Sequence, residues 1–162
     1  MKTRLPLLFV AILLTAAVPL LLGAGTPSKS TPPRASVSKD VKYYNQGVKA
    51  QNQGDYQRAV ELYRKALRVN PNFADALNNL GFSLRSIGKQ YMDEAMQSYD
   101  RALQLKRDHQ QALEYQGELY LWRGQLQKAN ENYQRLRRLN SREATKLKKH
   151  LDRMVAQAKQ IG

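Results

Sequence analysis

The sequence predicts an all-α fold made of stacked helix–turn–helix units, and three regularities of spacing support this. Gly47, Gly81 and Gly117 lie 34 and 36 residues apart. Each of them is followed seven residues later by another glycine, at Gly54, Gly88 and Gly124. Each unit then has an alanine with a tyrosine four residues after it: Ala59 with Tyr63, Ala95 with Tyr99, and Ala129 with Tyr133. A period of about 34 residues is typical of solenoids, in which each unit packs against its neighbours.

The first unit shows helical periodicity in both of its halves. Tyr43, Gly47 and Ala50 share one face of a first helix, since spacings of three and four residues return to the same side. The apolar face of a second helix is formed by Ala59, Leu62, Tyr63, Ala66 and Leu67. Gly54-Asp55 separates the two helices, and Asn70-Pro71 ends the second. Small residues allow the helices to approach closely, and the aromatic rings fill the remaining space.

At these positions the chain resembles the tetratricopeptide repeat (TPR) family. The matching residues are Tyr43, Gly47, Gly54, Ala59, Tyr63, Ala66 and Pro71 in unit one; Leu77, Leu80, Gly81, Leu84, Gly88, Ala95, Tyr99 and Ala102 in unit two; and Leu113, Gly117, Tyr120, Gly124, Ala129 and Tyr133 in unit three. The resemblance implies a right-handed solenoid of three repeats, at residues 40–73, 74–109 and 110–142. The second repeat has a two-residue insertion at Gly88–Met92, which is either tolerated in a surface turn or used for a contact by Tyr91.

The N-terminal segment is of a different composition and predicts export. Lys2 and Arg4 precede a run without charges from Leu5 to Ser28, which contains the small residues Gly23-Ala24-Gly25. Residues 1–25 are therefore expected to be a cleaved signal peptide or a retained membrane anchor, and an anchor would place the repeats outside the cytoplasm. The chain has no cysteine, which excludes a lipid-anchored bacterial lipoprotein. Residues 26–39, rich in Pro, Ser, Thr and Lys, predict a flexible linker. The expected location is the periplasm, or the inner membrane facing it.

A basic helix is predicted after the third repeat, at residues 143–162. Leu147, Leu151 and Val155 fall on one face, which would cover the apolar flank that the last repeat leaves exposed. Five cations that flank this stripe define the basic patch: Arg142, Lys146, Lys148, Lys149 and Arg153. They contribute to a formal net charge of +14, which favours anionic partners.

No constellation in the sequence predicts catalysis, a cofactor or a metal site. His109 and His150 are the two histidines, and both are expected to be isolated surface residues. Neither a phosphate-binding glycine loop nor a nucleophile elbow occurs. No nucleic-acid-binding motif occurs either. A repeat scaffold without these features is expected to be a non-enzymatic binding protein whose partner is another protein.

The predicted binding surface is the concave face, which the first helix of each unit lines in TPR folds. The residues expected to form a partner-binding groove there are Tyr44, Val48, Asn78, Asn79, Phe82, Arg85, Glu114, Tyr115, Glu118 and Trp122. Aromatic rings with amide and charged neighbours suit a peptide segment or a partner helix. For Trp122, packing against the terminal helix is the alternative. A carboxylate clamp of the kind that some TPR domains use for chaperone tails does not carry over, since only Asn79 fits it.

The function expected from these features is that of a protein–protein interaction scaffold or adaptor of the bacterial cell envelope. The alternative is a structural protein whose basic C-terminal helix binds an anionic surface formed by lipid, a polyanion or an acidic protein. Salt distinguishes the two, because contacts through aromatic rings survive moderate salt and contacts through a basic patch weaken steeply. The partner's identity and the oligomeric state do not follow from the sequence.

Overall fold

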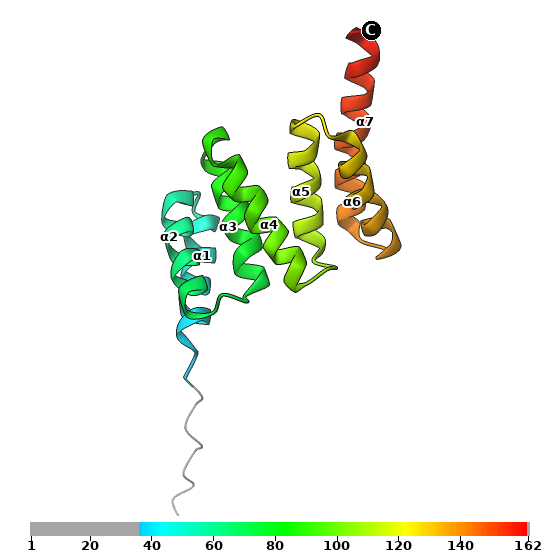
Figure 1. The fold of residues 1–162 in the computed structure, drawn as a ribbon. Helices are drawn as coiled ribbons and strands as arrows, with labels where there is room; N and C mark the ends of the chain where they lie inside the picture. Colours follow the sequence, from blue (N-terminus) through cyan, green and yellow to red (C-terminus); the bar gives the residue numbers. More distant parts are fainter. Residues whose placement is uncertain (1–35, 162) are drawn as a thin grey trace, which may run out of the picture. The chain divides into compact units, whose positions relative to one another are not determined.

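The structure is a computed structural model that describes residues 36–161, and these belong to one compact unit. The predicted signal or anchor segment and most of the predicted linker lie outside the described residues. Within residues 36–161 every regular element is helical, so the prediction of an all-α solenoid is confirmed (Figure 1). No helix in this part of the chain is both long and apolar enough to cross a membrane.

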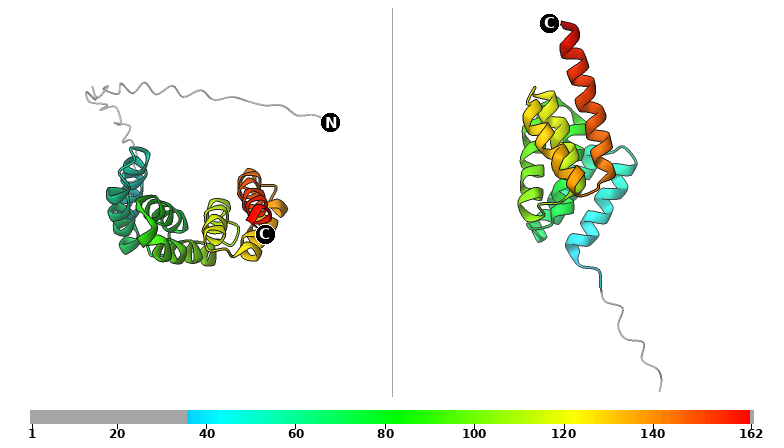
Figure 2. Two further views of the ribbon diagram at one scale, coloured as in Figure 1. Left: turned by 90° about the horizontal axis from the view of Figure 1, so that it is seen from above. Right: turned by 90° about the vertical axis from the view of Figure 1, so that its right-hand side faces the viewer.

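Three helix pairs follow one another along the chain, and a single long helix ends it. The bounds are α1 Lys39–Asn52 and α2 Tyr56–Val69, α3 Ala74–Ile87 and α4 Met92–Leu105, α5 Gln110–Trp122 and α6 Leu126–Arg138, and α7 Arg142–Ile161. Seen end on, the helices form a curved row in which α1, α3, α5 and α7 make the inner layer and α2, α4 and α6 the outer layer (Figure 2).

The turns inside the pairs follow from local sequence. Gly54 and Gly124 have φ values of 78° and 70°, a left-handed conformation that glycine adopts without steric cost. Directly after Gly54, the side chain of Asp55 accepts a hydrogen bond of 3.0 Å from the backbone N–H of Arg58 and so caps α2. These residues place each second helix antiparallel to its first.

The two-residue insertion of the second repeat forms a short 3-10 helix, η1 Lys89–Tyr91, between α3 and α4. Tyr91 is partly buried and packs against the hydrophobic core. The inserted residues are therefore an ordered part of the turn, and the Tyr91 ring makes a contact inside the domain.

The core of each repeat depends on a glycine of the first helix. A Cβ atom added at Gly47 would lie 2.6 Å from the ring of Tyr63, and one at Gly81 would lie 2.8 Å from the ring of Tyr99. Both tyrosines are fully buried, as predicted. The third repeat differs, because Gly117 faces Leu147 of α7 at 2.5 Å and Tyr133 is only partly buried. The same alanine–tyrosine spacing therefore leaves Tyr133 less enclosed than Tyr63 and Tyr99.

Candidate partner-binding groove

Half-buried aromatic side chains of the inner layer form the floor of the candidate groove. Phe82 of α3 and Tyr115 of α5 lie in contact, with ring centroids 5.2 Å apart. Tyr44 of α1 instead packs against Phe73, at 4.7 Å, and against the buried Tyr63, at 5.9 Å. The aromatic rings predicted for the groove are therefore present, but they form two separate groups. One group surrounds Tyr44 on α1, and the other consists of Phe82 on α3 and Tyr115 on α5. Each group keeps part of its ring surface accessible to a partner.

Amide and hydroxyl groups connect α1 to α3 beside these rings. The Asn79 amide donates to the Tyr44 hydroxyl at 3.3 Å. Gln51 Oε1 accepts from the hydroxyl groups of Tyr63, at 3.0 Å, and Ser83, at 3.2 Å. Val48 is partly buried and packs against the core. The contacts between α1 and α3 in this half of the groove are therefore made by neutral groups.

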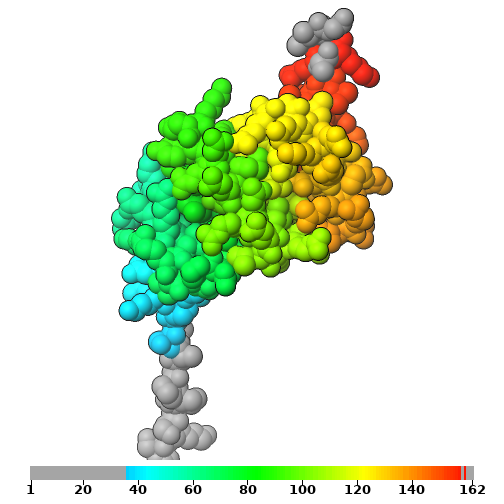
Figure 3. All heavy atoms as spheres, in the orientation of Figure 1, coloured from blue at the N-terminus to red at the C-terminus, as the bar shows by residue number. Residues whose placement is uncertain are grey.

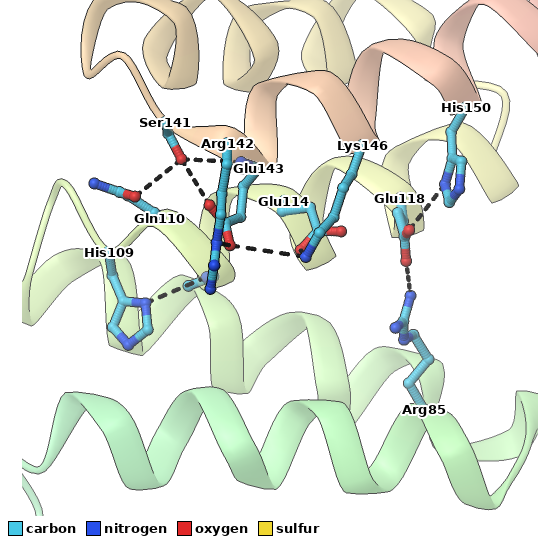
Figure 4. Close-up of polar contacts among 11 residues, drawn as sticks. Arg85, His109, Gln110, Glu114, Glu118, Ser141, Arg142, Glu143, Lys146 and His150 are labelled. Atoms are coloured by element: carbon cyan, nitrogen blue, oxygen red, sulfur yellow. Dashed lines mark hydrogen bonds and ion pairs between the residues drawn. The ribbon is translucent and has the colours of Figure 1, made fainter.

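Arg85 is the centre of the charged half of the groove (Figure 4). Its guanidinium carbon lies 5.6 Å from the centroid of the Phe82 ring, 5.1 Å from that of Tyr115 and 5.9 Å from that of Trp122, within cation–π range. The same guanidinium donates to Glu118 Oε2, and His150 Nδ1 lies 2.8 Å from Glu118 Oε1. Side chains from α3, α5 and α7 are thus joined in one chain of contacts.

Glu114 lies one helical turn before Glu118 on α5 and is buried beneath α7. Its carboxylate has Lys146 Nζ 3.9 Å away, and its Oε2 atom has no hydrogen-bond partner. Burial raises the pKa of Glu114 to about 7, although Lys146 acts in the opposite direction. Glu114 therefore changes charge near neutral pH at the contact between α5 and α7.

Three predicted groove residues do not face a partner. Asn78, Glu114 and Glu118 have exposed fractions of 4%, 3% and 8%, so the expectation that they point into an open groove is wrong. Asn78 donates to Asn79 at 3.1 Å, and the two glutamates contact α3 and α7. These residues are buried because neighbouring helices approach them closely. The spacing of residues within one helix does not predict such contacts between helices.

Trp122, at the end of α5, is the most accessible aromatic residue of the predicted groove. Its exposed fraction is 61%, so it does not pack against α7, which was the alternative for it. Lys89, Met92, Leu119 and Arg123 line a hollow beside its ring. Exposed tryptophans are uncommon, and they are enriched among residues that dominate binding energy.

The basic patch is present on α7, but several of its charges are paired within the chain. Arg142 lies 3.3 Å from Glu143, Lys146 lies 3.7 Å from the same carboxylate, and Lys148 lies 2.6 Å from Asp152. Lys149 and Arg153 are exposed. The positive field of this patch is therefore smaller than its composition indicates.

His109 has a structural role that the sequence analysis missed. It is buried, with an exposed fraction of 5%, so the expectation of a surface histidine is wrong. Its Nδ1 atom accepts from the backbone N–H of Ala112 at 3.3 Å, which caps α5, and Nε2 lies 3.0 Å from Asp75 of α3. Burial lowers the pKa of His109, against the effect of Asp75. A histidine directly before a predicted helix start was the available signal for this cap.

The described residues contain no group of three or more His, Cys, Asp or Glu side chains that could hold a metal ion. The groups that the concave face does bring together are rings, amides and ion pairs. They supply contact area and hydrogen bonds for a ligand.

A stack of helix pairs with a ring-lined inner layer defines the class: a helical-repeat solenoid with a concave face lined by aromatic rings. Two family patterns match the chain, the TPR repeat at residues 52–88 and the tetratricopeptide repeat at residues 74–109. The chain belongs to the tetratricopeptide repeat family. Together the two matches cover the turn and second helix of the first repeat and all of the second repeat.

Two relatives in sequence cover different shares of the chain. An uncharacterized protein of Methanocaldococcus jannaschii is 33% identical over 72 residues, which are 44% of this chain and 81% of the relative. The photosystem I assembly protein Ycf3 of Prochlorococcus marinus is 31% identical over 105 residues, which are 63% of this chain and 60% of the relative. The chain thus spans less than two thirds of the length of that assembly protein.

Solved structures share the fold at low identity. The first TPR domain of Spaghetti (RPAP3), in complex with an HSP90 peptide, has a TM-score of 0.65 at 22% identity and covers 73% of this chain and 94% of its own. MamA has a TM-score of 0.56 at 21% identity and covers 68% of this chain and 59% of its own. At these identities the likeness concerns the fold alone.

Proposed function

We propose that this protein is a non-enzymatic scaffold that binds a segment of another protein in its concave groove. The observation that carries the proposal is the contact between Phe82 and Tyr115, half-buried on adjacent inner helices, with Arg85 over both rings. Such an arrangement offers a rigid aromatic surface with one cation at low entropic cost. The peptide bound by the RPAP3 domain and the assembly role named for Ycf3 are consistent with this class of function.

The bound segment is expected to cross two chemically different halves of the groove. Beside Tyr44 and Asn79 it meets a ring and amide groups, which pair with backbone groups of a ligand. Beside Arg85 and Trp122 it meets the ion pair of Arg85 with Glu118 and an exposed indole. A segment with apolar side chains at intervals fits both halves.

We also propose that the protein acts in the bacterial cell envelope, outside the cytoplasm. The proposal rests on Lys2 and Arg4 followed by the charge-free run of the N-terminal segment. The mass of the protein from its native host distinguishes a cleaved signal from an anchor. Loss of residues to about Ala24 supports cleavage, whereas a full-length mass in the membrane pellet supports an anchor. Recovery of the full-length protein from the cytosol contradicts export.

The test of the groove is affinity capture from an envelope extract, with single substitutions of its rings. Phe82→Ala and Tyr115→Ala should each remove the captured partner, because binding energy concentrates in a few buried aromatic contacts. Tyr120→Ala is the matched control, since Tyr120 is a partly buried tyrosine of the same helix that lines the opposite, outer side. Melting curves of all variants show that each is folded.

Two outcomes would contradict the proposed groove. Undiminished capture by both ring variants would remove the concave face from consideration. Loss of capture only on charge reversal of Lys149 and Arg153, with a steep decline in salt, would favour the basic patch and an anionic surface as ligand. Binding to an anionic surface is the second candidate function, because Lys149 and Arg153 are exposed and can contact such a surface.

A further inference from the structure

The outer side of the solenoid carries a series of seams between successive second helices. The first seam has α2 and α4 as walls and α3 as its floor, with Leu77 and Leu80 at the bottom. The second has α4 and α6 as walls and α5 as its floor, and Asp100 and Lys128 lie on its two walls. Each of these seams is therefore enclosed by three helices.

The third seam has a single wall within residues 36–161. Its floor is α7 and its single wall is α6, and Figure 3 shows both helices at the end of the described unit, with α7 projecting beyond it. Two adjoining hollows run along this seam and share Tyr133, Lys148 and Asp152. A second helix therefore borders this seam on one side only, whereas second helices border each of the other two seams on both sides.

The register of α7 relates it to the first helices of the three repeats. Leu77, Leu113 and Leu147 are spaced by 36 and 34 residues, and each is at most 2% exposed. By spacing, Leu147 therefore falls at the register of a first-helix leucine, and α7 follows α6 as the first helix of a further unit would, with no second helix after it in residues 36–161. A second helix would cover the apolar side chains that border the seam, Leu126 and Val155, which are now 38% and 43% exposed.

The charges around the open seam indicate the chemistry of its occupant. Arg137, Lys148 and Lys149 line it, and Asp152 is the acidic residue among its lining side chains. In the first seam the two walls are joined by an ion pair, Arg64 of α2 with Glu94 of α4 at 2.5 Å. An acidic helix placed against α6 would make contacts of the same kind. A second copy of the chain, with its net charge of +14, would be repelled from this surface.

We propose that the seam between α6 and α7 is a second protein-binding surface, and that its occupant is a partner helix with an acidic face. The helix seats where the second helix of a fourth repeat would lie. Its apolar residues cover Leu126 and Val155, and its carboxylates pair with Arg137 and Lys149. This surface is independent of the concave groove, so both can be occupied at once.

The probe for this surface is a synthetic helical peptide of the length of α2 and α4, which have 14 residues each. One face carries leucine and alanine, and the other carries glutamate. A second peptide has glutamine in place of every glutamate. Fluorescence anisotropy with the full chain should give an affinity about tenfold or more higher for the glutamate peptide, the size expected for a few paired charges.

Two exposed side chains test the seat of the peptide. Val155→Ser should weaken binding about tenfold, since it removes apolar contact area. Val69→Ser on α2 is the matched control, because Val69 is 50% exposed and lies in the first repeat. Arg137→Glu should weaken binding at least as much, whereas Arg68→Glu, an exposed arginine of α2, should not. Because all four side chains are exposed, the variants are expected to fold.

Three outcomes would overturn the proposal. If Val69→Ser weakens binding as much as Val155→Ser, the peptide does not use this seam. If Phe82→Ala abolishes binding and Val155→Ser does not, the peptide lies in the concave groove. If phosphatidylglycerol vesicles bind the chain, and both vesicle and peptide binding depend on Arg137 and Lys149 but not on Val155, the surface is a lipid-binding patch. Binding that depends on both the charge and Val155 supports a helix as its occupant.

Discussion

The second and third repeats close their cores in different ways. In the second, the Cα of Gly81 faces the ring of Tyr99, a fully buried residue of the same repeat. In the third, Gly117 faces Leu147 of α7, and Tyr133 is only partly buried. The side chain that packs against the glycine therefore comes from the same repeat in the second repeat, and from the following helix, α7, in the third. The same glycine–alanine–tyrosine spacing thus supports two packing arrangements.

The contacts between inner helices also differ between the N-terminal and C-terminal ends of the solenoid. Between α1 and α3 the bridging groups are neutral, such as Asn79 with the Tyr44 hydroxyl. Between α5 and α7 they are ionic, with Lys146 near Glu114 and His150 near Glu118. The contacts between α5 and α7 should therefore respond to pH and salt more strongly than those between α1 and α3. Four predictions test this difference.

The largest expected effect is the removal of a filling ring. Tyr99→Ala should lower the free energy of unfolding by about 3–5 kcal/mol, because it leaves a cavity in a closed core. Tyr133→Ala should cost about 1–2 kcal/mol, since part of that ring is already in water. Urea denaturation followed by circular dichroism measures both. Equal costs would show that the two repeats are closed alike.

Leu147→Ala tests the dependence of the third repeat on α7. The loss of a fully buried leucine should cost about 2–4 kcal/mol. Hydrogen exchange should accelerate in α5, α6 and α7 and remain slow in α3 and α4. Leu105→Ala is the control, because Leu105 is 44% exposed. Faster exchange spread evenly over all helices would argue against a separate C-terminal unit.

Glu114 should make the stability of this unit depend on pH. Its pKa in the folded state, about 7, lies above the ordinary value of 4.5, so the fold favours the neutral acid. The free energy of unfolding should therefore fall as pH rises between these values, by up to about 3 kcal/mol. Glu114→Gln should remove that decline and be the more stable protein at pH 8.

His109 also contributes to the pH dependence of stability, and its contribution must be separated from that of Glu114. His109 has a lowered pKa, so its contribution to stability is lost as pH falls below its ordinary value of 6.5, with or without Glu114. The difference between wild type and Glu114→Gln therefore isolates the carboxyl group. Glu131→Gln, an exposed site on α6, serves as control. A stability difference that is the same at pH 5 and pH 8 would contradict the assignment.

The smallest expected effect comes from adding one methyl group to each glycine. In Gly81→Ala the new Cβ lies 3.1 Å from the backbone oxygen of Ala95 as well as against Tyr99, so relief requires a helix to move. A cost of about 1–3 kcal/mol is expected. In Gly117→Ala the new atom meets the end of the Leu147 side chain, which can rotate, and the cost should be lower. Thermal melting ranks the two, and the reverse order would mean that α7 is held more rigidly than α4.

The fold could be predicted from the sequence because its determinants are local. Gly54 favours a turn, and the four-residue spacing of Ala59 and Tyr63 places both on one face of a helix, independently of distant parts of the chain. The family pattern then supplies the stacking. No long-range pairing of strands had to be inferred.

The candidate site was predicted less completely, because burial there depends on neighbouring helices. Phe82 and Trp122 are accessible as expected, but Asn78 and Glu118 are covered by contacts between helices. His109 is buried at the start of α5 with Asp75 of α3 beside it, a contact between residues 34 positions apart. Charge in the basic patch was likewise overestimated, since pairing such as Lys148 with Asp152 depends on side-chain conformation.

The chain of contacts from Arg85 through Glu118 to His150 bears on how the solenoid bends. It connects three successive inner helices, α3, α5 and α7, on the side that must open when the curvature decreases. Straightening the row therefore stretches ionic contacts at this end, whereas at the α1 end it stretches a neutral hydrogen bond. Bending stiffness should accordingly be unequal along the molecule and should soften at the C-terminal end when salt screens these charges. A partner that requires a wider curve would bind more readily at high ionic strength, and one that fits the curve as it stands would not.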